Sequence, residues 1–127
     1  MRRAGFAVLP AVLFTMLMSC VSHPGSPDRR LTRNAVREAE AAFNRGMVYH
    51  HRGDFHRAIT EYTRALATLP AFIPALGSRA EVYVLTESWD LAIADLMALL
   101  LIEPENPFAI ELLSIAEAMA AGHPEEE

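Results

Sequence analysis

Hydrophobic residues in the middle of the chain recur at helical spacing. In residues 53–70, GDFHRAITEYTRALATLP, apolar side chains return every three or four positions and so form one stripe on one face of a helix. Gly53 permits a sharp reversal before this segment, and Pro70 lacks the N–H that would continue the helix. The pattern therefore predicts a helix between these two residues. Its predicted buried stripe is Ala58, Ile59, Tyr62, Ala65 and Leu66.

The same pattern returns later in the chain. When residues 39–72 are aligned with residues 73–106, an offset of 34 residues, eight positions are identical, among them Arg45 with Arg79 and Pro70 with Pro104. Other positions of the two segments hold similar residues; for example, Glu61 aligns with Asp95. A period of this length indicates a repeat built from two helices and a turn.

The repeat resembles the tetratricopeptide repeat. In a unit counted from Ala39, the positions of that family's pattern hold Gly46, Tyr49, Ala58, Tyr62, Ala65 and Pro70. In the next unit, counted from Ile73, they hold Ala80, Tyr83, Ala92, Leu96, Leu99 and Pro104. The resemblance implies an all-α fold, a short right-handed α-solenoid with repeats at 39–72 and 73–106 inside a domain of residues 31–121. Leu99 is larger than the family's usual alanine, so we expect looser packing in the second hairpin.

The residue types at these positions have physical reasons. Two helices approach within about 8–10 Å only where the side chains at their crossing are small. We assign that role to Gly46, Ala58, Ala80 and Ala92. Large rings then fill the gaps around the crossings, and they are supplied by Tyr49, Phe55, Tyr62, Tyr83 and Trp89. Asp54 and Ser88 are expected to cap the second helices.

The two ends of the domain follow from the same reasoning. Helical spacing upstream of the first repeat predicts that the first helix begins near residues 28–34. After the second repeat, Asn106 is a capping residue and Pro107 suits the first helical position, which predicts a helix at 107–121. Glu117 stands where the repeats have tyrosine, so this helix is expected to cover the solenoid and face water on its other side. Residues 122–127 form an acidic tail.

The beginning of the chain has the composition of an export signal. Arg2 and Arg3 precede an apolar stretch at 4–18, which is shorter than the roughly 20 residues of a membrane-spanning helix. The stretch ends in LMSC, which resembles the lipobox of bacterial lipoproteins. That resemblance implies a signal peptide at 1–19 and a diacylglycerol group on Cys20. The residue after the cysteine, Val21, is not the aspartate that marks retention in the inner membrane, so the resemblance also implies a location in the outer membrane. The composition of residues 20–30 predicts a flexible tether. A plain cleaved signal and an uncleaved anchor remain alternatives.

Charge and candidate chemistry exclude several functions. The net charge is −5, there is no lysine, and residues 65–127 contain one arginine against eleven carboxylates, which disfavours nucleic acid as a partner. No nucleophile, base and acid stand at a readable spacing, so we expect no enzyme, no cofactor and no small-molecule substrate. His50, His51 and His56 cluster near the first turn, but adjacent histidines point about 100° apart. Polar surface is favoured over a metal site.

A binding module is the class that remains. The resemblance implies a concave groove lined by the first helix of each repeat, and its candidate partner-binding residues are Glu40, Phe43, Met47, His50, Glu81, Val84, Phe108 and Glu111. Further groove positions hold His51, Pro74, Gly77, Leu85 and Ile115. Phe43 and Met47 replace the polar residues of the family's carboxylate clamp. An apolar groove flanked by acid suits an amphipathic helix or an extended peptide.

The sequence therefore predicts a protein–protein adaptor, lipid-anchored in the bacterial cell envelope and facing the periplasm from the outer membrane. The alternative is a structural or self-associating subunit of an envelope complex, with the groove filled by the protein's own N-terminal segment. The sequence does not identify the partner.

Overall fold

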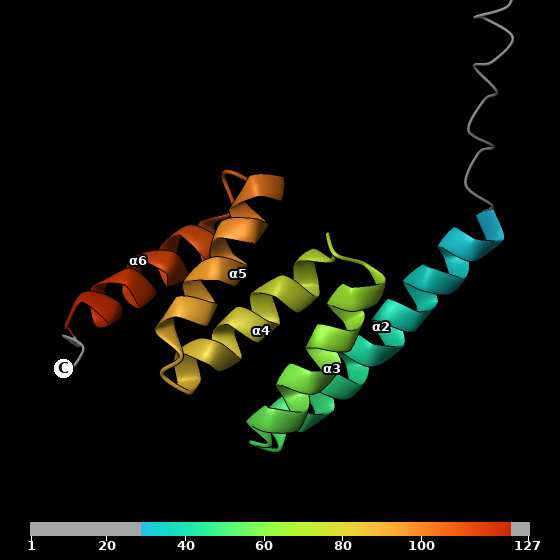
Figure 1. The fold of residues 1–127 in the computed structure, drawn as a ribbon, viewed down its shortest axis with the longest axis horizontal. Coiled ribbons are helices and arrows are strands. Elements are labelled where there is room, and N and C mark those ends of the chain that lie inside the picture. The colour runs from blue at the N-terminus through green and yellow to red at the C-terminus, as the bar shows by residue number, and fades with distance from the viewer. Residues whose placement is uncertain (1–28, 123–127) are drawn as a thin grey trace, which may run out of the picture. The chain divides into compact units, whose positions relative to one another are not determined.

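The computed structural model describes residues 29–122, and over that range the chain is all-α (Figure 1). Its five helices are α2 (Arg29–His51), α3 (Phe55–Thr68), α4 (Ile73–Leu85), α5 (Trp89–Ile102) and α6 (Pro107–Gly122). The predicted fold class is confirmed. The proposed signal peptide, Cys20, most of the tether and residues 123–127 lie outside the described residues. Residues 33–122 lie in one compact unit, and the packing below is that of this unit.

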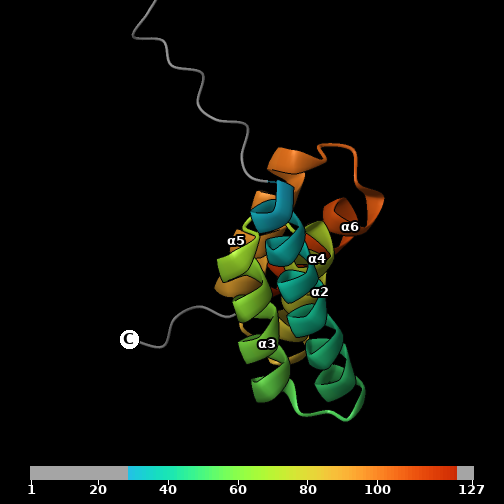
Figure 2. The same ribbon diagram turned by 90° about the vertical axis from the view of Figure 1, so that its right-hand side faces the viewer.

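Each helix packs on the next one along the chain. α3 lies against α4, and α5 lies against both α4 and α6, while α4 also reaches α6. Figure 2 shows α2 and α3 side by side as an antiparallel pair, and the bond from Arg45 Nε to Glu61 Oε2 (2.8 Å) joins them. The arrangement is that of two helical hairpins followed by a single helix. The predicted starts of α2 near residues 28–34 and of α6 at Pro107 are confirmed.

Local interactions explain where the helices begin. The Asp54 carboxylate accepts a bond from the Arg57 N–H (3.2 Å), and the Asn106 side-chain oxygen accepts one from the Ala109 N–H (3.0 Å), as predicted. Ser88 occupies the N-cap position of α5, as predicted, but its side chain makes no capping bond to that helix. Its hydroxyl instead lies 3.4 Å from that of Thr86, another hydroxyl in the same turn.

The core follows the small residues of the repeat. Of the predicted stripe on α3, Ala58, Tyr62, Ala65 and Leu66 are buried and Ile59 is half-buried. At the first crossing Gly46 meets the Tyr62 ring, where a Cβ on residue 46 would lie 2.6 Å from two ring carbons. Glycine is therefore required at this point of closest approach between α2 and α3.

In each hairpin a large side chain fills the space between the two helices, but it comes from the first helix in one hairpin and from the second helix in the other. In the first, the ring of Phe43 on α2 packs against a core that contains Ala65. In the second, the equivalent positions hold Gly77 and Leu99, and Leu99 is almost fully buried. A Cβ on Gly77 would lie 3.6 Å from a Leu99 methyl group, so the glycine leaves room for the larger leucine. The second hairpin thus accommodates the residue that was expected to loosen it.

The terminal helix matches its prediction only in part. α6 buries Ala109 and Ala116 and exposes Glu111, Ser114 and Glu117, as expected of a helix that covers the end of a solenoid. It also exposes hydrophobic side chains, namely Phe108, Ile110, Ile115 and Met119. Its water-facing surface is therefore less polar than the sequence predicted.

Candidate functional site

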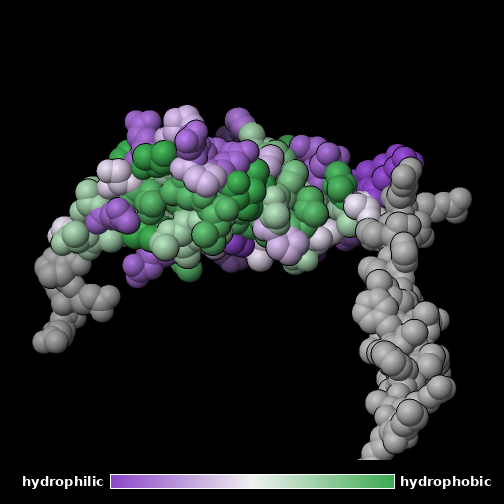
Figure 3. Space-filling model, turned by 90° about the horizontal axis from the view of Figure 1, so that it is seen from above, coloured by the Kyte–Doolittle hydropathy of each residue, from purple (hydrophilic) through white to green (hydrophobic). Residues whose placement is uncertain are grey.

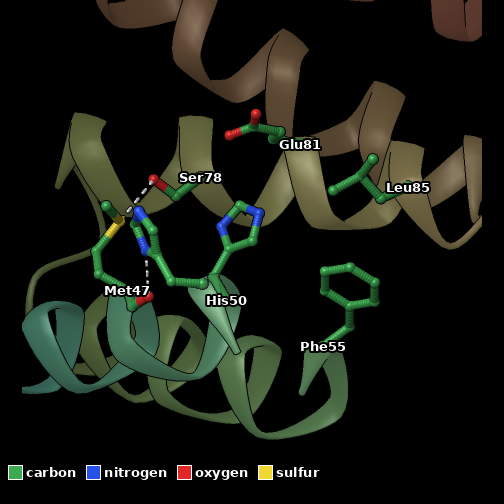
Figure 4. A pocket seen from close by; sticks show the side chains of 7 residues that line it. Met47, His50, Phe55, Ser78, Glu81 and Leu85 are labelled. Atoms are coloured by element: carbon green, nitrogen blue, oxygen red, sulfur yellow. Dashed lines mark hydrogen bonds between the residues drawn. The ribbon is translucent and has the colours of Figure 1, made fainter. Parts of the chain in front are cut away.

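An open pocket of about 460 Å³ lies between α2 and α4 (Figure 4). The end of α2 forms one wall, the middle and end of α4 form the other, and the first residue of α3 closes one end. The lining residues are Met47, His50, His51, Phe55, Ser78, Glu81 and Leu85. The volume lies within the range of pockets that hold small ligands or side chains of a partner.

Helical geometry brings these side chains together. Met47, His50 and His51 are spaced by three and four residues on α2, and so share one face. On α4, Ser78, Glu81 and Leu85 are related in the same way. Figure 4 shows the two sets projecting toward the space between the helices. Both sets come from first helices of the repeats, which is the side on which the sequence placed the groove.

The buried Tyr62 contacts two of the residues that line the pocket. Its hydroxyl donates to Met47 Sδ (3.3 Å) and lies 3.3 Å from His50 Nδ1. Burial raises the pKa of this hydroxyl, a hydrogen bond with Ser78 opposes the shift, and the charge of Glu81 adds to it. The phenol therefore stays neutral and holds Met47 and His50 in place as a positioned wall of the pocket.

The neighbouring histidine is also held by a hydrogen bond. His51 Nδ1 lies 2.7 Å from the carbonyl oxygen of Met47, and since a carbonyl only accepts, Nδ1 carries the proton. The other ring nitrogen makes no described hydrogen bond within the part of the chain that the structure covers. It can therefore serve a ligand at the mouth of the pocket.

A second, smaller pocket of about 210 Å³ lies on the other side of α4, toward α6. Its lining comprises Ile73, Pro74, Gly77, Ser78, Glu81, Leu99, Asn106 and Phe108. The ring of Phe108 approaches α4 at Gly77, where a Cβ would lie 3.4 Å from a ring carbon. Ser78 and Glu81 line both pockets, so the two concavities meet along α4.

The structure brings together half of the candidate residues. Met47, His50 and Glu81 line the first pocket, and Phe108 lines the second together with Glu81. The others, Glu40, Phe43, Val84 and Glu111, line neither of these two pockets.

Phe43 is half-buried, with its ring 5.7 Å from that of Tyr62 and 5.6 Å from that of Phe72. It is therefore a packing residue between the two core clusters. Glu40 and Glu111 are exposed, and at the end of α4 it is Leu85, not Val84, that enters the first pocket.

Two residues that line the first pocket were not predicted as groove residues from the sequence. Ser78 lies between Pro74 and Glu81 on the same helical stripe, so the spacing of four and three residues was a signal that could have found it. Phe55 was assigned to the core as a gap-filling ring. It is half-buried and faces the pocket at the start of α3.

Within residues 29–122, no three side chains among histidine, cysteine, aspartate and glutamate gather closely enough to hold a metal ion. None of the helices in that range is both long and apolar enough to cross a membrane.

Comparison with known proteins supports the repeat. Residues 39–72 match the family model of the tetratricopeptide repeat, with the bounds that the sequence predicted for the first repeat. A search of curated proteins finds no match. The match and the succession of helices together favour protein–protein interaction as the general role of the domain.

Proposed function

We propose that the protein is an adaptor that binds a segment of a partner protein in the pockets beside α4 and is held in the bacterial cell envelope by a lipid on Cys20. The observation that supports the binding site is the convergence of Met47, His50, Glu81 and Leu85 on one open pocket. Apolar walls provide burial for a partner's side chains, and the histidines and Glu81 provide polar contacts.

Exposure of Leu85 makes the proposal testable in cells. Its side chain is 54% exposed in the first pocket, and Leu91 on α5 is 53% exposed but lines neither pocket. A photoreactive residue placed at 85 should cross-link a partner protein in growing cells. The same residue at 91 is the matched control and should give little of that product.

The position of the cross-link decides between the candidate occupants. A partner protein trapped from position 85, and far less from 91, supports the adaptor. A cross-link from 85 to residues 20–32 of the same chain would instead support a groove filled by the protein's own N-terminal segment. Equal trapping of one partner at both positions would argue against a specific groove.

The anchor is a separate part of the proposal, and it rests on LMSC followed by the tether. Each buried CH₂ contributes about 0.8 kcal/mol, so two or more acyl chains hold a protein on a bilayer where one does so only marginally. Cys20→Ala should release or misprocess the chain, which membrane fractionation and gel mobility would report. Density separation of the membranes tests the outer-membrane location. Wild-type amounts of mature-sized variant in the membrane fraction would contradict lipidation.

Self-association is the second candidate, and exposed hydrophobic side chains favour it. Leu101 is 86% exposed and Met97 is 56% exposed on α5, and α6 adds others. Figure 3 shows hydrophobic side chains gathered on one face over the part of the unit that holds α5 and α6. Sedimentation equilibrium of the full chain in detergent should give a concentration-independent monomer for an adaptor. Dimers that form with rising concentration would favour a self-associating subunit.

A further inference from the structure

Glu81 occupies a distinctive place on the proposed binding surface. It lines both pockets, and its side chain is exposed on α4. The carboxylates of Asp54, Glu61 and Asp95 each have an arginine within 4.0 Å. Across residues 32–122, Glu81 has no ion-pair partner of this kind. Its charge is therefore free to interact with a ligand.

Apolar side chains lie on both sides of Glu81. Met47, Phe55 and Leu85 contribute to one pocket, and Ile73, Leu99 and Phe108 contribute to the other. Because Ser78 and Glu81 are common to both, a single ligand that fills both pockets must pass over these two residues. Such a ligand removes water from the carboxylate, which is costly unless the ligand supplies a cation.

Other charges nearby point the same way. Neither pocket is lined by an arginine. The arginine of α4, Arg79, is already bonded to Asp95 through Nε and Nη2 (both 2.7 Å). The other ionisable groups lining the first pocket are His50 and His51. The two pockets are thus lined by one free carboxylate, that of Glu81, and by no arginine.

We propose that the partner segment carries an arginine or lysine between two apolar side chains, with the cation paired to Glu81 and one apolar side chain in each pocket. This rests on the proposed function, because it specifies the ligand of the same surface. Arginine is favoured over lysine, since its planar guanidinium bonds a carboxylate through two N–H groups.

A selection from random peptides tests this chemistry directly, because it does not require the partner to be identified. The full chain, immobilised in mild detergent at pH 8, is used to select binders from a phage library of random twelve-residue peptides. Selected peptides should be enriched in arginine or lysine with apolar residues on both sides. Their affinity should fall at least tenfold for Glu81→Gln. It should change less than twofold for Glu87→Gln, which alters an exposed glutamate outside both pockets.

Failure of this inference and failure of the proposed function give different results. Peptides that lose affinity for Leu85→Asp, but lack basic residues and bind Glu81→Gln as well as wild type, would overturn the inference and leave the groove intact. Acidic peptides would also overturn it. A library that yields no binder, or only binders indifferent to Leu85→Asp, would contradict the groove itself.

Discussion

Gly46 and Gly77 are both buried glycines inside helices, but their surroundings differ. Alanine is better than glycine in a helix by about 1 kcal/mol. At residue 46 a Cβ would lie 2.6 Å from the Tyr62 ring, whereas at residue 77 the nearest atom is 3.4 Å away. Gly46→Ala should therefore lower the free energy of unfolding by about 1–3 kcal/mol through overpacking. Gly77→Ala should leave it equal or raise it by up to about 1 kcal/mol. Urea denaturation measures both, and a stabilising Gly46→Ala would contradict the crossing.

Glu87 adopts a backbone conformation that glycine prefers. Its φ is 58°, and Gly53, at the equivalent place in the first hairpin turn, has φ 75°. A side chain in this left-handed region costs roughly 1–2 kcal/mol. Glu87→Gly should therefore stabilise the protein by about 1 kcal/mol, and Gly53→Ala should destabilise it by a similar amount. Thermal melting of the two variants tests the equivalence of the turns, and a drop in melting temperature for Glu87→Gly would contradict it.

Residue roles were harder to predict than residue types. The sequence assigned Phe43 to the groove because of its repeat position, yet its ring packs against Phe72 and Tyr62. The reason is that Ala65 on the facing helix is small, so Phe43 fills the space, whereas Leu99 does so in the second repeat. Which of two facing helices carries the large side chain depends on three-dimensional packing, and the spacing of residues along the sequence does not reveal it.

At the scale of the helices, two equivalent ion pairs differ in their surroundings. Arg79 bonds both oxygens of Asp95 and also Thr63, so it joins α4 to α5 and to α3. The hydrogen bond with Asp95 raises the pKa of Arg79, and the guanidinium keeps its charge. The equivalent Arg45 makes one bond, to Glu61. The Arg79 and Asp95 side chains are 17% and 9% exposed, against 48% for Arg45.

These differences predict unequal contributions to stability. Arg79→Met should cost about 2 kcal/mol or more, because it leaves Asp95 buried without its cation. Arg45→Met should cost at most about 1 kcal/mol, since the exposed arginine is screened by water. Methionine keeps the apolar stem in both variants, so lost packing is matched. Equal losses in urea denaturation would contradict the larger contribution of the buried Arg79–Asp95 pair.

Helix number, order and most boundaries could be predicted, because they follow from spacing, prolines and caps along the chain. Burial could be predicted only where a neighbour exists. Val82 on α4 is fully buried beneath α3, while the identical repeat residue Val48 on α2 is 49% exposed. No earlier repeat covers α2 within the described residues, so the same residue at the same repeat position lies in a different environment.

For the whole molecule, the proposed function joins a membrane anchor to a domain that presents two pockets beside one helix. The groove position could be predicted from the order of the helices, and half of the candidate residues line these pockets. The arrangement of one pocket on each side of Glu81 could not be predicted, because it depends on how α2 and α6 are placed on either side of α4. The domain's role therefore depends on whether a partner occupies that surface.

The most direct test is the affinity of the partner segment, identified by cross-linking from position 85, for three full-length proteins: wild type, Leu85→Asp and Leu91→Asp. Isothermal titration calorimetry in detergent gives the dissociation constants, and urea denaturation confirms equal folding. Since buried anchors often carry about 2 kcal/mol or more of binding energy, we expect at least tenfold weaker binding for Leu85→Asp. For Leu91→Asp we expect a change below twofold. Equal affinities for all three proteins, or a loss confined to Leu91→Asp, would contradict the claim that the pocket between α2 and α4 binds the partner.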